Sequence, residues 1–481
     1  MTLQTPVAER PATPDLAVAD DGYAALLKNR NFVALWLGQI FSQLGDRVVF
    51  VVFIAMIVHY FGTSDSYNSY LYVAFTIPAI LLTAVAGVFV DRWPRRAVLV
   101  TTNVLRAGFI AMLPWAAARS MTLFPLYMMA FLVSCATQFF VPAEAATIPT
   151  IVDKRHLLQA NSLFLTTMMA SLIFGFALGD PLINIFSLKQ VHWAIVGLFL
   201  MASAALCFVK VPPSSVARSS SATLGEAWTR FFAEIREGAD YIRSHPMVLA
   251  AMLKLAVLFT TVVSVCFLFI NFAKVYLYDN ALVAASKFSY IVAFSGIGMA
   301  VGSVCIGKFL QRNRQSTMVY GGFVVTGLCL ALLTMVSWMP KHENVLNFPP
   351  TTSLFVYLDR FTLTTRMVYT YTLAMIMGVA GSLVAVPLQA LLHELIPEDK
   401  RGKVLGVQFT LLSTASTLPV VVAGLAVEYT GVNTMFLLIG IPLLLLGLGG
   451  FITRGQPVPI PLQQSADTQQ DGPSHVAPAN W

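Results

Sequence analysis

Long apolar runs separated by short polar segments fill the chain from residue 32 to residue 453. Each run is close to the roughly 20 residues that an α-helix needs to cross the hydrocarbon core of a bilayer. Twelve runs are present, at 32–60, 70–90, 97–118, 122–145, 160–185, 192–210, 247–272, 289–310, 317–338, 368–393, 404–428 and 434–453. The runs lack the alternation of apolar and polar residues that is typical of membrane β-barrel strands. Backbone N–H and C=O groups inside a bilayer must form hydrogen bonds with one another, and a helix satisfies them within one segment. The pattern therefore predicts an all-α membrane protein with twelve transmembrane helices.

The first six and the last six runs share landmarks that indicate an internal repeat. The segment 141–149, marked by two prolines, has a counterpart at 386–397, and 87–92 has a weaker one at 307–312. The two offsets differ because the long segment 339–367 joins the ninth and tenth runs. We therefore expect two six-helix repeats, an arrangement that places the substrate site between the halves near the bilayer midplane.

Polar segments divide the chain into five parts. We expect a disordered cytoplasmic N-terminus (1–27), an N-terminal six-helix half (28–210), a linker (211–246), a C-terminal six-helix half (247–453) and a disordered cytoplasmic tail (454–481). Apolar residues recur at helical spacing within the linker, which predicts an amphipathic helix on the cytoplasmic membrane surface.

Composition agrees with a membrane protein. The chain is 57% hydrophobic and 11% charged, with a mean hydropathy of +0.74, whereas soluble proteins carry about 25% charged residues. The basic residues behind the net charge of +7 are scattered over short loops, so we expect membrane anchoring and no nucleic-acid partner. The five cysteines all fall inside apolar runs and the seven histidines are dispersed, so neither set predicts a metal site.

The basic residues also predict the orientation. If the N-terminus is cytoplasmic, eighteen Lys and Arg residues fall on the cytoplasmic side and seven on the other. Cytoplasmic loops of membrane proteins carry the excess of basic residues. We therefore predict a multi-pass protein of the cell (inner) membrane with both termini in the cytoplasm.

Two charged residues lie at the middle depth of their apolar runs. Asp46 stands about fifteen residues into the first run and Arg106 about ten into the third. Charges at this depth are costly and usually functional, and a carboxylate that exchanges a proton for an ion-pair partner can couple transport to protons. Asp46 and Arg106 are therefore our candidates for proton or substrate coupling. The alternative is a static pair, such as Asp46 with its neighbour Arg47.

A charged loop follows the second run. Gly87 would let another helix approach closely. Asp91 could then face the positive N-terminal end of the eleventh helix, which is expected to begin after Gly402 in the other half. Glu144 could pair with an arginine of this loop, and a solvated interfacial carboxylate is the alternative. The predicted cytoplasmic latch comprises Gly87, Asp91, Arg92, Arg95, Arg96 and Glu144. The alternative is a basic anchor with one compensating acid.

Several aromatic, amide and sulfur side chains within the runs suit an apolar pocket with few polar groups. Such pockets bind bulky amphiphiles, and methionine adapts to varied shapes. The candidates for cavity lining are Phe50, Phe53, Gln138, Met168, Asn271, Tyr371 and Gln408. Each of them also suits simple helix packing.

Together these motifs resemble the major facilitator superfamily, and within it the drug:proton antiporter branch with macrolide efflux proteins and the enterobactin exporter. The resemblance covers about residues 28–453 and rests on the segments 31–46, 87–96, 142–161, 237–243 and 396–404. It implies the major facilitator fold and a latch that closes the cytoplasmic side in the outward-open state. Two departures are Asp180, placed between Gly179 and Pro181 in the glycine motif of the antiporters, and Gln311, where the second repeat lacks the acid.

We expect a secondary active transporter that exports a hydrophobic or amphipathic small molecule, drug- or macrolide-like, with protons as the coupling ion. It is expected to act as a monomer in the lipid bilayer, without a cofactor and without enzymatic activity. No Walker A loop is present in the sequence, which argues against direct coupling to ATP. The alternatives are export or import of a specific siderophore-like metabolite and, from another class, a membrane-embedded lipid enzyme.

Overall fold

The computed structural model describes residues 19–62, 65–115, 122–153, 156–211, 233, 236–309, 315–340, 344–347 and 362–452. Its helices and strands are α1 (Ala19–Lys28), α2 (Arg30–Phe61), α3 (Asp65–Arg92), α4 (Arg95–Ala111), α6 (Phe124–Ile151), α7 (Leu157–Cys207), α9 (Pro246–Phe272), the π-helix η4 (Ala273–Leu277), α10 (Ala281–Phe309), α11 (Gln315–Leu333), the 3-10 helix η6 (Thr334–Trp338), β1 (Asn344–Asn347), β2 (Thr362–Thr364), α12 (Thr365–Leu395), α13 (Glu398–Thr430) and α14 (Val432–Ile452).

The helices confirm the predicted twelve-helix architecture. The long helix α7 is two helices joined at Ser187, whose φ of 61° interrupts the helical backbone. With α7 counted once, nine helices of the described chain are long and apolar enough to cross a membrane. The other two, α3 with 28 residues and α13 with 33, exceed the roughly 20 residues that a span needs. Each half of the chain therefore contributes six spans.

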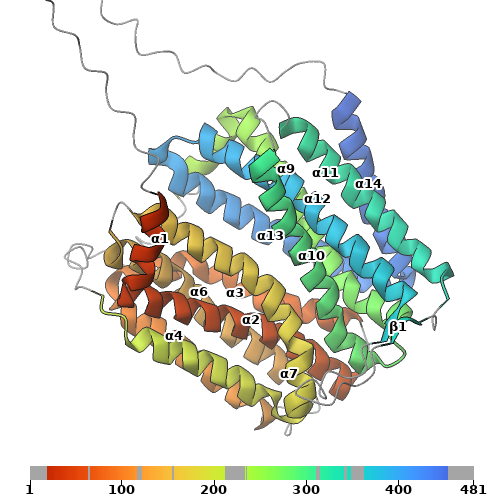
Figure 1. Cartoon of the computed structure of the whole chain (residues 1–481), viewed down its shortest axis with the longest axis horizontal. Helices are drawn as coiled ribbons and strands as arrows, with labels where there is room; N and C mark the ends of the chain where they lie inside the picture. Colours follow the sequence, from red (N-terminus) through yellow and green to blue (C-terminus); the bar gives the residue numbers. More distant parts are fainter. Residues whose placement is uncertain are drawn as a thin grey trace, which may run out of the picture.

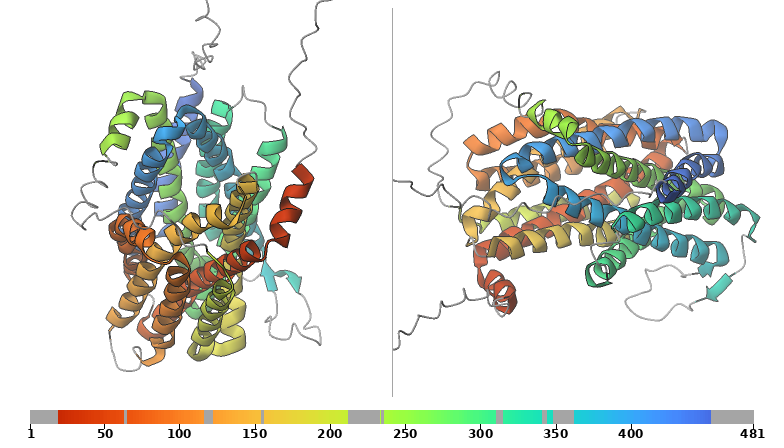
Figure 2. Two further views of the ribbon diagram at one scale, coloured as in Figure 1. Left: turned by 90° about the vertical axis from the view of Figure 1, so that its left-hand side faces the viewer. Right: turned by 90° about the horizontal axis from the view of Figure 1, so that it is seen from above.

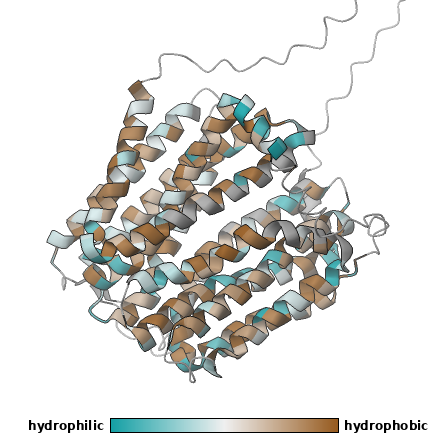
Figure 3. Cartoon of the chain, turned by 180° about the vertical axis from the view of Figure 1, so that it is seen from behind, coloured by the Kyte–Doolittle hydropathy of each residue, from teal (hydrophilic) through white to brown (hydrophobic). Residues whose placement is uncertain are grey.

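The two halves form two bundles. Figure 1 shows α2, α3, α4, α6 and α7 on one side, and α9 to α14 on the other. Figure 3 shows that brown, hydrophobic residues cover most of both bundles, as a lipid environment requires. We call the end that bears α1 the α1 end, and the end that bears the β1–β2 ribbon the hairpin end. The right-hand view of Figure 2 places them at opposite ends of the molecule.

The N-terminal segment differs in part from the prediction. Residues 19–27 are helical in α1 rather than disordered, and residues 1–18 lie outside the described part. Leu26 is only 2% exposed because it joins a core cluster with Phe32 and Val209, and this burial stabilises the helix. The side chain of Asn29 then caps α2 by accepting from the backbone N–H groups of Asn31 and Phe32.

Most of the linker, 212–232 and 234–235, lies outside the described residues, so its amphipathic helix stays a prediction. Residues 236–244 are helical and dock on the C-terminal half. Tyr241 donates a hydrogen bond to the carbonyl of Leu395, 3.1 Å away, and Lys400 lies over its ring. The five-part division of the chain, apart from residues 19–27, also stays a prediction.

The long segment between α11 and α12 contains a short antiparallel ribbon, in which β1 pairs with β2. Arg366, 9% exposed, holds the base of this segment. It donates to the carbonyls of Met339 and Tyr276, the latter at 3.0 Å. These contacts join the start of α12 to the ends of η6 and η4.

The two halves touch from the middle of the bundle to its hairpin end. The helix pairs in contact include α7 with α10, α3 with α13, α2 with α10 and α3 with α9. The backbone N–H of Ser66 donates to Glu428 (3.2 Å), and the hydroxyl of Ser69 donates to the carbonyl of Val420 (3.5 Å). In this conformation the described contacts therefore hold the halves together at the hairpin end.

Candidate functional site

An ion pair lies inside the N-terminal bundle. The Nη1 atom of Arg106 on α4 lies 3.1 Å and 3.2 Å from the two carboxylate oxygens of Asp46 on α2. The side chain of Arg106 is 0% exposed, whereas that of Asp46 is 27% exposed. The structure thus brings together the two residues predicted for coupling. The alternative partner, Arg47, forms no ion pair with Asp46 among the described residues.

The remaining atoms of Arg106 are held as well. Its Nη2 atom donates to the side-chain oxygen of Asn103 (3.0 Å), and its Nε atom donates to the carbonyl of Thr102 (3.4 Å). The guanidinium lies between the rings of Phe140 and Phe199, 4.9 Å from each centroid. Asn103 and Arg106 share one face of α4, because residues three apart are neighbours on a helix. The cation is therefore fixed by four elements and is shielded from lipid.

Close packing of α2 against α7 supports this pair. A Cβ atom added at Gly175 would lie 2.6 Å from Cβ of Arg47, and one added at Gly179 would lie 2.6 Å from Cγ1 of Val51. Only glycine leaves room for these contacts. The glycines of the antiporter-like motif therefore set the position of the helix that carries Asp46.

Glu144 does not take the place that was predicted for it. Among the described residues it pairs with neither Arg95 nor Arg96, which donate instead to the carbonyls of Ala146 (2.7 Å) and Cys207. It is 7% exposed, and its Oε1 atom has no hydrogen-bond partner in the described part. The reason is that α6 continues to Ile151, so that Glu144 lies inside the helix and not at its end.

Glu144 belongs instead to the surroundings of the ion pair. It interacts electrostatically with Arg106 and Asp46. It also stands one helical turn after Phe140, the ring on which the Arg106 guanidinium lies. The site thus holds two carboxylates around one fixed arginine.

The predicted latch is not assembled at Gly87 in this conformation. A Cβ atom added at Gly87 would meet no atom of the described residues within 4 Å, so the expected close approach of another helix is absent there. The side chains of Asp91 and Arg92, at the end of α3, lie outside the described part. The latch stays a prediction. Its residues lie at the α1 end of the bundle, whereas the hydrogen bonds between the halves lie toward the hairpin end.

The candidate cavity residues fall into different surroundings. Phe50 joins an aromatic cluster with Phe75 and Phe176 of its own half and Phe267 of the other half. Phe53 is 0% exposed and leaves no surface for a ligand in this conformation.

The remaining candidates are packed to different degrees. Asn271 and Gln408 are buried, and the Nε2 atom of Gln408 donates to Gln389 (3.1 Å). Gln138 donates to the carbonyl of its own helix at Ser134, and Met168 is half-buried.

A second polar cluster joins the two halves. Asp180 on α7 contacts Ser286 and Tyr290 on α10. Nearby, Tyr371 on α12 stacks on Phe294, and its hydroxyl lies 3.1 Å from that of Tyr278. In the sequence, Asp180 stood out only as a departure from the glycine motif of the antiporters. The sequence carried no signal for its partners, which lie more than 100 residues further along the chain.

Twelve helices in two six-helix halves, with an ion pair inside one half, form the architecture of a membrane transporter. The sequence profile of the Major Facilitator Superfamily matches residues 35–348 and 350–479, so the chain belongs to that family. It is therefore a multi-pass membrane transporter of small molecules and not an enzyme, as predicted, and the lipid-enzyme alternative is excluded.

Curated relatives of nearly full length agree with this assignment. The uncharacterized MFS-type transporter YfiS of Bacillus subtilis is 25% identical over 87% of this chain and 92% of its own length. Macrolide efflux protein A of Streptococcus pyogenes is 20% identical over 85% and 92%, respectively. Multidrug efflux pump Tap of Mycolicibacterium fortuitum is 21% identical over 84% and 91%.

Solved structures show the same fold. A point mutant of the nucleoside transporter NupG matches with a TM-score of 0.64 at 12% identity, covering 88% of this chain and 99% of its own. A bacterial homologue of the iron transporter ferroportin in its inward-facing state matches with a TM-score of 0.61 at 16% identity and the same coverage. At these identities the likeness concerns the fold alone.

Proposed function

We propose that this transporter exports a hydrophobic or amphipathic small molecule, drug- or macrolide-like, in exchange for protons. The observation that carries the proposal is the ion pair between Asp46 and Arg106 inside the N-terminal bundle. A structural pair needs no access to water, yet the Asp46 side chain is 27% exposed while its partner is fully buried. The carboxylate can therefore receive a proton or a substrate, whereas the arginine stays in place.

The relatives support the direction and the substrate class. Two of the full-length relatives are described as efflux proteins, one for macrolides and one for several drugs. The aromatic cluster around Phe50, in which rings of both halves meet, offers the apolar surface that such compounds require. We further propose that the protein acts as a monomer.

The orientation is part of the proposal. The excess of basic residues supports an orientation in which the α1 end, the linker and both termini lie in the cytoplasm of a cell-membrane protein. The hairpin end then faces outward. Because the halves touch at the hairpin end, this conformation corresponds to the inward-facing state of an alternating-access cycle.

Coupling follows from competition for Asp46. When the carboxylate is ionised, the arginine neutralises it; when a proton binds, the bond to Arg106 weakens and the bundle can change its packing. Glu144 provides a second acceptor within the electrostatic reach of the same arginine, on the α1 side of Phe140. A proton released from Asp46 therefore has a carboxylate near it on the way to the cytoplasm.

Transport by purified protein in liposomes with an imposed proton gradient tests this proposal. Asp46→Asn mimics the permanently protonated acid, so uphill efflux of macrolides or dyes should disappear while downhill exchange partly survives. Asp240→Asn, a change at an exposed carboxylate of the linker helix, is the matched control and should transport like the unaltered chain. Uphill transport by Asp46→Asn at the unaltered rate and pH dependence would refute the coupling role. Gradient-driven transport of siderophores alone would favour the metabolite alternative.

A further inference from the structure

Asp180 lies in the contact between the two halves, near the hairpin end. It belongs to α7 of the N-terminal half and is 3% exposed. Its Oδ1 atom lies 2.5 Å from the hydroxyl of Ser286, and its Oδ2 atom lies 3.0 Å from the hydroxyl of Tyr290, both on α10 of the C-terminal half. Asn184, one turn along α7, donates to Oδ2 at 3.3 Å. A single buried acid thus connects the halves.

Among the described residues, no cation balances this acid. Three tyrosines from the elements packed against it interact with it electrostatically: Tyr278, Tyr290 and Tyr371. Lys287 directs its ammonium group to the ring of Tyr278, 5.9 Å from the centroid, and no cation of the described chain lies within ion-pair distance of Asp180. On the α2 side, Val51 covers the neighbouring Gly179. An ionised carboxylate buried without a counter-charge is strongly unfavourable in a membrane.

The polar groups around this carboxylate can also accommodate a proton. Ser286 and Tyr290 from the C-terminal half and Asn184 from its own helix all lie within hydrogen-bond distance of its two oxygens. When Oδ1 of Asp180 is protonated, the acid can donate to the hydroxyl oxygen of Ser286, and Ser286 can then donate to the carbonyl of Val283, 3.1 Å away.

We propose that Asp180 is a proton-binding site that is protonated when the two halves close at the hairpin end. The proton comes from the solvent on the hairpin side while this end is open, and it binds Oδ1 of the carboxylate. Closure then buries a neutral acid that donates to Ser286 and accepts from Tyr290 and Asn184. Loss of the proton leaves a buried charge without a cation and drives the halves apart.

This site is distinct from the Asp46–Arg106 pair, although its part in the transport cycle rests on the proposed proton-coupled function. Because the closed form binds the proton more tightly, acid must favour closure at the hairpin end. One proton changes the equilibrium constant between the open and closed forms by at most about tenfold per pH unit. The proposal therefore defines both the direction and the maximum steepness of the pH dependence of closure.

The distance between the halves at the hairpin end provides the test. Spin labels would be attached at Tyr60→Cys and Tyr429→Cys, which are exposed and end α2 and α13, in a full-length chain without its native cysteines. Pulsed electron resonance in phospholipid nanodiscs would measure the distance between about pH 5 and about pH 9. We expect short distances in acid and longer ones in base. Asp180→Asn, which reproduces the hydrogen bonds of the neutral acid, should give short distances throughout.

Two further variants complete the test. Glu428→Gln changes another carboxylate that bridges the halves, the acceptor for Ser66, and should keep the pH response. Ser286→Ala removes the acceptor of the acid proton and should lower the closed fraction at acid pH. A distance that does not change with pH, or an Asp180→Asn chain that keeps the original pH response, would overturn the proposal. Neither result depends on transport by Asp46 variants, so the two proposals fail separately.

Discussion

At the scale of single residues, Arg106 shows how a charge is tolerated at bilayer depth. Its guanidinium is surrounded by a carboxylate, an amide oxygen, a backbone carbonyl and two aromatic faces. Their positions in the middle of apolar runs were sufficient to select Arg106 and Asp46 as candidate functional residues. Their partners Asn103, Phe140 and Phe199 were not predictable, because amides and aromatic residues are common in packed helices.

Removing the cation alone should therefore be more harmful than removing the pair. Arg106→Met fills the space between the two rings but leaves Asp46 without its partner, which should destabilise the protein by about 3–5 kcal/mol. Asp46→Asn combined with Arg106→Met removes both charges and should recover most of this loss. Thermal unfolding of the purified variants in detergent measures both effects. A double variant no more stable than Arg106→Met would show that the arginine acts by packing and not through the pair.

At the scale of helices, the sequence predicted the spans better than their ends. Every expected run corresponds to a helix, because some 20 apolar residues have no other stable arrangement in lipid. The ends were displaced where helices continue beyond the apolar run: α6 reaches Ile151 and α10 begins at Ala281. Backbone hydrogen bonds decide where a helix stops once it leaves the hydrocarbon. This displacement is why Glu144 was assigned to the latch and not to the surroundings of the ion pair.

Contact between α2 and α7 provides a prediction at this scale. Gly179→Ala should destabilise the protein by about 1–3 kcal/mol, since the new methyl group would meet Val51 in a packed interface. Combining it with Val51→Ala makes room and should cost less than the sum of the two single changes. Gly197→Ala, on the same helix but with no described atom within 4 Å of the added Cβ, is the matched control and should leave stability unchanged or slightly raised. Equal melting temperatures of the Gly179 and Gly197 variants would contradict the close contact.

At the scale of the whole molecule, the sequence predicted the number of halves but not how they meet. Val420 and Glu428 contact residues of α3 that are more than 350 positions away, and no periodic pattern marks such pairs. Which end is closed also depends on the conformation. The latch around Gly87 and the cluster around Asp180 lie toward opposite ends of the bundle, so alternating access would assemble one as it separates the other.

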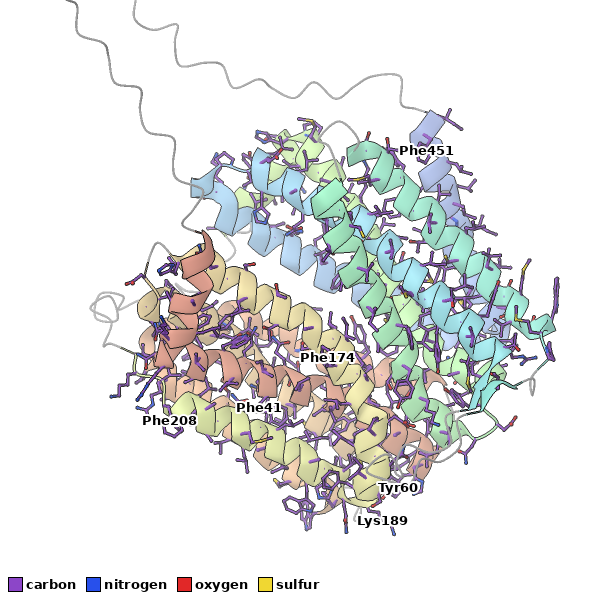
Figure 4. All side chains as sticks on the ribbon, in the orientation of Figure 1. Phe41, Tyr60, Phe174, Lys189, Phe208 and Phe451 are labelled. Atoms are coloured by element: carbon purple, nitrogen blue, oxygen red, sulfur yellow. The ribbon has the colours of Figure 1, made fainter. Side chains whose placement is uncertain are left out.

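The assignment of the two ends to the two sides of the membrane makes the last prediction. In Figure 4, Phe208 lies at the α1 end, whereas Tyr60 and Lys189 lie at the hairpin end. Exposed positions near each end are suitable for single cysteines in a chain without native cysteines: Phe208 and Ser244 at the α1 end, Trp338 and Tyr429 at the hairpin end. A membrane-impermeant thiol reagent applied to intact cells should label the hairpin-end pair alone, because the proposed orientation, which rests on the excess of basic residues, puts the α1 end in the cytoplasm. Permeabilised cells, in which all four positions should react, control for accessibility. Labelling of Phe208→Cys but not of Trp338→Cys in intact cells would reverse the orientation, and the conformation closed at the hairpin end would then be the outward-facing state.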